Sequence, residues 1–580
     1  MQKKTIIARH IFTLFNFVNL VLALLVFSVH SYRNLLFLVV AIVNTVIGLV
    51  NELRAQKIIN QLKLISEKKQ IIVRNGQKIE IHSAKIQKGD HIIYMPGSQI
   101  TVDAKIIEGT IEVNESFITG ESDNIKKVKD DKLISGSFVM SGTCEAIAEA
   151  VGDDIFVNRL SKSAREIQSS TPKLFRIINQ IIKYASIFIL PVGTLLLISR
   201  LRLSTISIDV AVTSTVASLI SMIPEGLVLL TSSVLALSSI RLAKQKVLVQ
   251  DLYSIETLAR ADVICLDKTG TITDSDGKVR ANATKIISYF YKNDITPLMI
   301  SGDTIDVVER VAKEVKFKSP RIADLSKIAN PDYGDLVKNY NIFAKATPES
   351  KKALVVALKH AGHVVAMTGD GVNDILAMKE ADCSIAIGDG TDAARRVARF
   401  VLLDSDFAAI PDIIHEGRRT INNIERSATL FLSKTTYATI LSIIFIFLPF
   451  AYPFSPIGMS FLNFACIGFP AFVLALEPNN ERVKDRFVYN IKHLSIPTGL
   501  LNAVSILTIS IISHQLGFDH ALTTTIAMLA TFTIDTILIY RISRPLNKLR
   551  LALFVVILFL AAIVFLIPPV SAFFGLVPLF

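Results

Sequence analysis

The sequence predicts a helical membrane protein with many spans that also carries two soluble domains, one of β-strands and one of alternating strands and helices. Hydrophobic residues make up 51% of the 580 residues and the mean hydropathy is +0.48, which is too apolar for an ordinary soluble protein. Several apolar runs are long enough to cross a bilayer, and two long polar stretches separate them. A chain of this length is also too long for a single domain.

Nine apolar runs are candidate spans, four in the first half of the chain and five in the second. We expect them near 11–29, 35–50, 184–199, 210–240, 428–450, 458–476, 496–512, 521–540 and 551–567. They divide the chain into a hairpin at 1–50, a soluble domain at 51–183, a second group of spans at 184–240, a second soluble domain at 241–426 and a last group of spans at 427–580.

Basic residues lie on one predicted side of the spans and give the chain a formal net charge of +12. The positive-inside rule accounts for this charge and places both soluble domains in the cytoplasm, so we expect a multi-pass protein of the cell membrane in contact with lipid. No basic stripe with interleaved aromatic residues is present, so we expect no nucleic-acid partner. No small-residue cleavage site follows Val29, which indicates an uncleaved first span.

The first soluble stretch, 51–183, opens with a helical segment and continues as short alternating strands. Its turn signals contain glycine: Asn75-Gly76, Lys88-Gly89-Asp90 and Pro96-Gly97. Short strands separated by such turns predict a small β domain.

The second soluble stretch, 241–426, repeats an apolar run that ends in aspartate and precedes a helical segment. These runs end at Asp267, Asp303 and Asp370. Apolar strands alternating with helices predict a doubly wound, Rossmann-type parallel sheet, in which ligands bind beyond the carboxyl ends of the strands. We therefore expect the three aspartates to gather in one crevice.

The carboxylates of this stretch indicate phosphoryl transfer. Gathered carboxylates repel one another unless a cation lies between them, so Asp267, Asp370 and Asp374 predict a Mg²⁺ site. A tight turn follows Asp267, and its backbone amides can face phosphate oxygens, as expected for a carboxylate nucleophile. Ser301 and Lys351 can supply a hydroxyl and an ammonium group. In phosphoryl transfer the protein mainly positions groups and stabilises charge, and this set can do both.

Two segments, DKTGTIT at 267–273 and TGDGVND at 368–374, resemble the signature motifs of P-type ATPases. TPESK at 347–351, SGD at 301–303 and TGES at 119–122 extend the resemblance. It implies that the β region is an actuator domain and that the α/β region is a phosphorylation domain of the haloacid dehalogenase-like type.

The resemblance also implies a role for each matching residue. Asp267 would become the aspartyl phosphate, and Lys268 and Thr269 follow it in the same catalytic motif. The backbone of Thr269 would bind Mg²⁺ together with the carboxylates. The other implied residues are Lys351 and Ser301 for holding phosphate, Glu121 for orienting the hydrolytic water, and Thr269, Gly302, Asp303 and Asn373 for binding ATP or another phosphoryl donor.

An ion site is indicated within the fourth run, where Pro224-Glu225-Gly226 interrupts an apolar helix. Proline removes a backbone hydrogen bond, and a carboxylate at membrane depth is costly unless it faces a functional cavity. Freed carbonyls and one carboxylate can form an oxygen cage for a hard cation. The alternative is a proline kink beside a neutral, buried glutamic acid.

The segment MIPEGL at 222–227 resembles the corresponding motif of bacterial calcium-type pumps, and no CPC motif of heavy-metal pumps is present. The resemblance makes Ca²⁺ the leading cation, with Glu225 and Asn463 as ligands. Two-site calcium pumps have further carboxylate and amide ligands where this chain has Thr435, Ala438 and Ile467. One ion per cycle is therefore expected, although Mn²⁺, Mg²⁺ and monovalent cations stay open.

Three other charged residues lie within or beside the spans. Lys434 is either a countercharge built into the protein or a side chain that extends to the membrane surface. Asp535 and Glu477 are interpreted as structurally paired or interfacial and not as ion ligands.

The resemblance also implies a nucleotide-binding domain, for which this sequence leaves no room near 274–284. The ten residues 274–283, at about 3.5 Å each when extended, can bridge a gap but cannot fold, and the KGA-type nucleotide motif and a tenth span are missing as well. Use of ATP is thus in doubt: a partner could supply nucleotide binding, or a small acyl phosphate could phosphorylate Asp267. A membrane-anchored phosphatase of the haloacid dehalogenase type and a non-pumping regulatory remnant are the alternatives.

Overall fold

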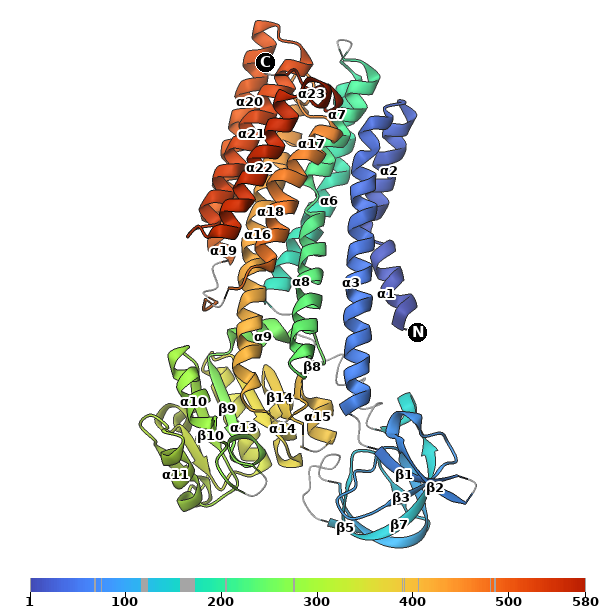
Figure 1. The fold of residues 1–580 in the computed structure, drawn as a ribbon, viewed down its shortest axis with the longest axis vertical. Coiled ribbons are helices and arrows are strands. Elements are labelled where there is room, and N and C mark those ends of the chain that lie inside the picture. The colour runs from blue at the N-terminus through green and yellow to red at the C-terminus, as the bar shows by residue number, and fades with distance from the viewer. Residues whose placement is uncertain are drawn as a thin grey trace. The chain divides into compact units, whose positions relative to one another are not determined.

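The computed structural model describes residues 2–66, 69–74, 76–115, 124–156, 173–203, 206–274, 277–388, 390, 392–404, 406–479, 481–483 and 487–578. The chain divides into two compact units (Figure 1). One unit comprises Met1–Ala55, Lys173–Ser238 and Arg418–Phe580, and the other comprises Gln56–Pro172 and Ser239–Gly417. The first unit is helical, and the second holds two β-sheets.

Long apolar helices run alongside one another in the helical unit (Figure 1). Its helices, some of which continue into the other unit, are α1 (Gln2–Ile11), α2 (Leu14–Ser28), η1 (Tyr32–Leu35), α3 (Leu36–Ser66), α6 (Lys173–Leu201), α7 (Ile208–Met222), α8 (Glu225–Lys244), α16 (Ala409–Phe445), α17 (Pro456–Leu462), η7 (Asn463–Gly468), α18 (Phe469–Leu476), α19 (Phe487–Asn490), η8 (Ile491–Ser495), α20 (Ile496–Leu516), α21 (His520–Ile542), α22 (Lys548–Leu566) and α23 (Pro568–Phe573).

Seven helical segments in the described part of the chain are long and apolar enough to cross a membrane. They are Tyr32–Ile58, Leu174–Leu201, Ala409–Phe445, Pro456–Leu476, Phe487–Leu516, His520–Ile542 and Lys548–Leu566. The two remaining expected spans correspond to the shorter apolar helices α2 and α7. The prediction of a multi-span helical protein is confirmed.

The run at 210–240 is two helices and not one. Helix α7 ends at Met222, Ile223 is extended with φ −86° and ψ 118°, and α8 begins at Glu225. Pro224 lies between the two helices, where its missing N–H and its ring prevent a continuous helix. The predicted interruption is therefore present in the backbone.

The first sheet has seven strands in the order β2-β1-β3-β7-β4-β5, with β6 paired to β4, and all its pairings are antiparallel. The strands are β1 (Lys69–Arg74), β2 (Gln77–His82), β3 (His91–Tyr94), β4 (Asp103–Asn114), β5 (Asn124–Lys127), β6 (Lys132–Leu133) and β7 (Phe138–Ala150). Alternate apolar residues along β3, β4 and β7 enter one core, because successive side chains of a strand point to opposite faces. This is the β domain expected from the sequence.

The second sheet has eight strands in the order β11-β12-β10-β9-β13-β14-β15-β8, and only β8 is antiparallel. Its strands are β8 (Val247–Val249), β9 (Val263–Asp267), β10 (Thr296–Ile300), β11 (Ile322–Asp324), β12 (Ile342–Ala344), β13 (Val365–Gly369), β14 (Cys383–Ile387) and β15 (Phe400–Leu402). The associated helices are α9 (Ser254–Arg260), α10 (Ala283–Lys292), α11 (Ile305–Glu314), α12 (Tyr333–Asn339), α13 (Pro348–His360), α14 (Ile375–Glu380) and α15 (Asp392–Val397). The central strands are fully buried, which confirms the predicted doubly wound parallel sheet.

A short connection follows β9. The turn η4 (Lys268–Ile272) leads to an antiparallel bridge between Thr273 and Val279, and α10 begins at Ala283. Arg280 N donates to Ile272 O, so the chain closes back on itself after a few residues.

Candidate active site

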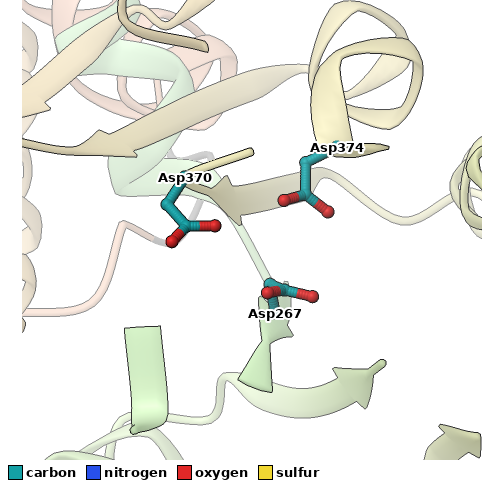
Figure 2. A group of neighbouring side chains, drawn as sticks. All are labelled: Asp267, Asp370 and Asp374. Carbon is teal, nitrogen blue, oxygen red and sulfur yellow. The ribbon is translucent and has the colours of Figure 1, made fainter. Parts of the chain in front are cut away.

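Three carboxylates converge beyond the carboxyl ends of the two central strands of the parallel sheet (Figure 2). Asp267 ends β9, Asp370 follows the last residue of β13, and Asp374 ends the short helix η6 (Val372–Asp374). One oxygen of each carboxylate lies within 4.8 Å of the others. Asp267 and Asp370 lie together because parallel strands bring their carboxyl ends to one edge of the sheet.

A buried lysine joins two of these carboxylates. Lys351 Nζ donates to Asp267 Oδ1 at 2.7 Å and to Asp374 Oδ1 at 2.6 Å. Lys351 lies in the first turn of α13, which Thr347 caps by accepting a hydrogen bond from Ser350 N and which Pro348 opens. The cap fixes the helix start and with it the direction of the lysine.

Burial and like charge make the carboxylates hard to ionise together. Burial and the neighbouring Asp374 raise the pKa of Asp267 to about 7, and the same two causes raise the pKa of Asp370 to about 6. Burial lowers the pKa of Lys351, but Asp374 and Asp267 outweigh this effect and hold it above the usual value. One ammonium therefore compensates only part of the negative charge of three carboxylates.

The donor set fits a hard divalent cation. The three carboxylates offer oxygen atoms close enough together that they could hold a metal ion, and Lys351 occupies only one oxygen each of Asp267 and Asp374. A cation there would remove the repulsion that raises the two pKa values. Thr269 is exposed in the turn after Asp267, and its backbone remains a candidate for the same site.

The turn after Asp267 requires glycine at its centre. Gly270 has φ +72°, and a Cβ atom there would overlap the carboxylate of Asp370. Arg280 Nη2 donates to Gly270 O at 2.9 Å, and Thr273 N donates to Lys268 O at 2.9 Å. The turn is thus held on both sides while Asp370 lies directly against it.

A second polar group forms at the end of the neighbouring strand β10. Ile300 is paired in register with Asp267, so Ser301 begins the adjacent loop. Ser301 Oγ donates to Asp303 Oδ2 at 2.8 Å, and Lys268 Nζ lies 3.0 Å from the same oxygen. Burial raises the pKa of Asp303, but these hydrogen bonds outweigh it and lower the pKa. Asp303 therefore pairs with Lys268, the residue after Asp267, and is not a member of the cluster of Asp267, Asp370 and Asp374.

Two further residues contribute to the site that the sequence did not single out. Thr368 Oγ1 accepts a hydrogen bond from Asp267 N at 3.3 Å and connects the two central strands behind the Asp267 side chain. Its position at the start of TGDGVND was the available signal. No sequence pattern marked Arg280, which lies within the short connection and donates to Gly270 O of the glycine turn.

Four other residues were expected from the sequence to contribute to a site: Gly302, Asn373, Glu121 and Glu225. Gly302 and Asn373 are exposed at the rim of the sheet. Glu121, with the rest of TGES, lies outside the described residues. The backbone of Glu225 opens α8, but its side chain is also outside the description.

Asn463 begins the π-helical segment η7 in the helical unit, and its Oδ1 is buried without a hydrogen-bond partner among the described atoms. An amide oxygen left unpaired inside a helical bundle is costly unless a ligand completes it. Thr435 Oγ1, by contrast, donates to Phe431 O of its own helix at 3.0 Å. Phe431 also lies against Gly226, where a Cβ atom would overlap the ring, so α8 and α16 approach closely beside the interrupted helix.

Comparison with protein families gives two matches. Residues 63–165 match the P-type ATPase actuator domain, and residues 276–382 match the haloacid dehalogenase-like hydrolase family. The first match falls on the β domain and the second on the parallel sheet.

Curated relatives cover nearly the whole chain. A probable cation-transporting ATPase, exp7, of Streptococcus pneumoniae is 29% identical over 689 residues, which cover 95% of this chain and 89% of that protein. The calcium-transporting ATPase CtpE of Mycolicibacterium smegmatis is 28% identical, with 99% of this chain and 90% of that protein covered. CtpE of Mycobacterium bovis is 29% identical, with 94% and 87% covered.

Proposed function

The chain belongs to the family of P-type ATPases, and we propose that it carries Ca²⁺ across the cell membrane through a phosphorylated Asp267. The observation that carries this proposal is the buried arrangement of Asp267 and Lys351 with two further carboxylates within 4.8 Å, in the same chain as a membrane helix interrupted at Pro224. Two of the similar proteins are named calcium-transporting ATPases, which supports Ca²⁺ as the cation. Both soluble domains would lie in the cytoplasm.

In the proposed reaction, an oxygen of Asp267 attacks the terminal phosphorus of the donor. A new oxygen–phosphorus bond forms while the bond to the leaving oxygen breaks, and that oxygen departs with the electron pair. Lys351 keeps a positive charge beside Asp267, and the glycine turn at Gly270 keeps Asp370 in place. Mg²⁺ held by Asp267, Asp370 and Asp374 would neutralise charge on the phosphoryl oxygens.

Hydrolysis would complete the cycle. Water attacks the phosphorus, phosphate leaves, and the carboxylate of Asp267 is restored. We assign the orientation of this water to Glu121 on the basis of the TGES motif. Ser301 follows the adjacent strand β10 and Lys268 directly follows Asp267, and both can contact phosphoryl oxygens once they part from Asp303.

We place the transported cation at the interrupted helix. The break at Pro224 frees backbone carbonyls between α7 and α8, Glu225 follows the break, and Asn463 offers an unpaired buried oxygen. Carbonyl, carboxylate and amide oxygens are the ligands that Ca²⁺ prefers. One carboxylate with few amide ligands is consistent with a single ion per cycle.

The source of the phosphoryl group is a separate part of the proposal. The alignment with the streptococcal relative runs over 689 residues, more than the 580 of this chain, so that relative has residues that this chain lacks. The short connection from Thr273 to Ala283 supports the inference that a nucleotide-binding domain is among them. Without an adenine pocket, ATP would lose the positioning that speeds phosphoryl transfer.

Transport is tested with ⁴⁵Ca²⁺ uptake into vesicles that contain the protein and are supplied with a phosphoryl donor. Wild-type vesicles should accumulate the ion, and Asp267→Asn and Glu225→Gln should reduce uptake to background, because the first lacks the nucleophile and the second lacks the charge of the ion site. Asp306→Asn, at an exposed aspartate of α11, is the matched control and should retain uptake. Equal uptake by all four proteins would contradict the proposal.

The donor is tested by labelling Asp267 with ³²P from ATP or from acetyl phosphate. Acetyl phosphate should label the wild type at least as fast as ATP at equal concentration, since neither donor gains from a nucleotide pocket. Faster labelling by micromolar ATP would instead require a nucleotide site in this chain or in a partner. Asp267→Asn should remain unlabelled with either donor.

A membrane-anchored phosphatase is the second candidate, and the short connection after β9 favours it because little chain is available there to cover the site. Turnover of a small phosphoester that responds neither to Ca²⁺ nor to Glu225→Gln would select it over the pump.

A further inference from the structure

Two spans of the helical unit are joined by a short turn. Helix α21 ends at Ile542 and α22 begins at Lys548, so residues 543–547 alone connect them. Both helices are long and apolar enough to cross a membrane. Because five residues reach at most about 3.5 Å each, the chain cannot travel far from the hydrocarbon core between the two spans. The turn therefore lies at the depth of the lipid headgroups.

Three basic side chains are exposed at this turn. Arg541 belongs to the last turn of α21, Arg544 lies in the connection, and Lys548 is the first residue of α22. Within the described part of the chain, none of the three forms an ion pair with an acidic side chain. Glu477, which lies beneath the turn, is buried and already paired with Arg550. The turn thus presents three positive charges for which the described residues supply no carboxylate.

Buried hydrogen bonds fix the path of the turn. Arg550 is 6% exposed, and its Nη1 donates to Ser543 O at 2.8 Å and to Pro545 O at 2.5 Å. The Nε and Nη2 atoms of the same side chain donate to Glu477 Oε2. Asn547 Oδ1 accepts from Arg550 N and caps α22. A backbone that is held from inside the protein lowers the entropy cost of binding a ligand at its outer side.

Apolar and aromatic side chains lie beside these charges. The Cζ atom of Arg544 lies 5.2 Å from the centre of the Tyr540 ring, which is the geometry of a cation–π contact. Leu546 and Leu549 are 44% and 45% exposed. Basic groups next to an aromatic ring and exposed leucines match the junction between phosphate headgroups and acyl chains.

We propose that the turn between α21 and α22 binds the headgroup of an anionic phospholipid, with Arg541, Arg544 and Lys548 contacting its phosphate. Arginine binds phosphate oxygens in pairs and lysine binds them as a point charge. The headgroup of phosphatidylcholine also carries a quaternary ammonium, which three cations repel, so the turn should prefer phosphatidylglycerol. This inference concerns a lipid and does not depend on which ion the protein carries.

A bound lipid would act on more than the turn. Arg550 links the turn to Glu477 at the end of α18, and Arg426 of α16 lies 3.4 Å from the same carboxylate. An anionic headgroup would offset the repulsion between the three exposed cations and these two buried or partly buried guanidinium groups. Phosphatidylglycerol should therefore raise the resistance of the protein to unfolding, because it binds the folded state.

The test measures the affinity of the purified full-length protein in detergent for phosphatidylglycerol and phosphatidylcholine by native mass spectrometry. The variant Arg541→Gln/Arg544→Gln/Lys548→Gln should bind phosphatidylglycerol about 100-fold more weakly than the wild type, since one basic residue near an anionic membrane surface contributes about fivefold. Both proteins should bind phosphatidylcholine equally weakly. The doubly substituted Arg541→Lys/Arg544→Lys protein keeps the charges and should retain the preference for phosphatidylglycerol.

A matched control removes the same charge elsewhere. Lys285, Lys292 and Lys316 are exposed lysines of the soluble unit, and Lys285→Gln/Lys292→Gln/Lys316→Gln should bind phosphatidylglycerol as the wild type does. Size-exclusion profiles and circular dichroism verify that each variant is folded.

Three outcomes would overturn the inference. One is equal affinity of the wild type for the two lipids, and another is equal affinity of the wild type and the folded triple variant of the turn for phosphatidylglycerol. The third is displacement of phosphatidylglycerol by millimolar inorganic phosphate, which would show that the turn binds phosphate in general. If the triple variant does not fold, the single variants Arg541→Gln, Arg544→Gln and Lys548→Gln, each expected to weaken binding about fivefold, provide the same decision.

Discussion

Replacing Lys351 by methionine is expected to slow phosphorylation of Asp267 about 100- to 1000-fold, the range seen when one charge-stabilising donor is removed from an active site. Methionine keeps much of the length of the side chain but removes the ammonium that donates to Asp267 and Asp374. The two carboxylates would then repel both each other and the incoming phosphoryl group. The rate of ³²P incorporation at saturating Mg²⁺ measures the effect.

Lys352 provides the matched control because it is the next residue of α13 and is exposed. Lys352→Met should phosphorylate at nearly the wild-type rate. Wild-type labelling of a folded Lys351→Met protein would show that the ammonium has no part in the reaction. Loss of labelling in both variants would point to damage to α13 and not to lost chemistry.

The second large effect is expected on stability, from the Glu477→Gln variant. Glu477 is 4% exposed at the end of α18, and its Oε2 accepts from Arg550 Nε at 2.9 Å and Nη2 at 2.7 Å. Arg426 lies 3.4 Å away, and Asn423 donates to Glu477 O at 2.9 Å. Neutralising Glu477 leaves the buried guanidinium of Arg550 and the partly buried guanidinium of Arg426 without their carboxylate, which should lower the free energy of unfolding by roughly 3–5 kcal/mol.

Unfolding in mixed micelles with increasing SDS, followed by circular dichroism, measures this change. Glu481→Gln is the control because the Glu481 side chain is exposed in the same loop, and its effect should stay within about 0.5 kcal/mol. Equal stability of the wild type and Glu477→Gln would mean that the buried arginines are satisfied by other groups. The sequence-based interpretation of Glu477 as structurally paired agrees with its contacts.

The sequence predicted the parts of the site that depend on local patterns of apolar residues, aspartate and proline. The pattern of apolar runs followed by aspartate predicted that Asp267 and Asp370 lie at the same edge of a parallel sheet. The carboxyl ends of parallel strands meet at that edge, so the two side chains lie close together. Pro224 likewise marked the break between α7 and α8, because proline acts on its own backbone. These features depend on local geometry, which sequence expresses directly.

The parts that escaped prediction depend on contacts across elements. The ion pair between Asp303 and Lys268 depends on how the loops after β10 and β9 are arranged, which no local pattern expresses. The approach of Arg280 to Gly270 and the hydrogen bond from Asn502 to Asp535 join segments with no shared pattern. The boundaries of the five sequence regions and the roles of Glu121 and Glu225 remain predictions.

The π-helical turn η7 affects how this span can be compared with those of other proteins. Such a turn holds one residue more than an α-helical turn, so residues after Gly468 are offset by one position from where an α-helix would place them. An ungapped alignment with a regular helix would therefore pair side chains that point in different directions on one side of the turn. Whether a ligand position of another protein aligns with Asn463 or Ile467 therefore depends on where the alignment places the extra residue. Alignments of this span should allow a one-residue gap within 463–468.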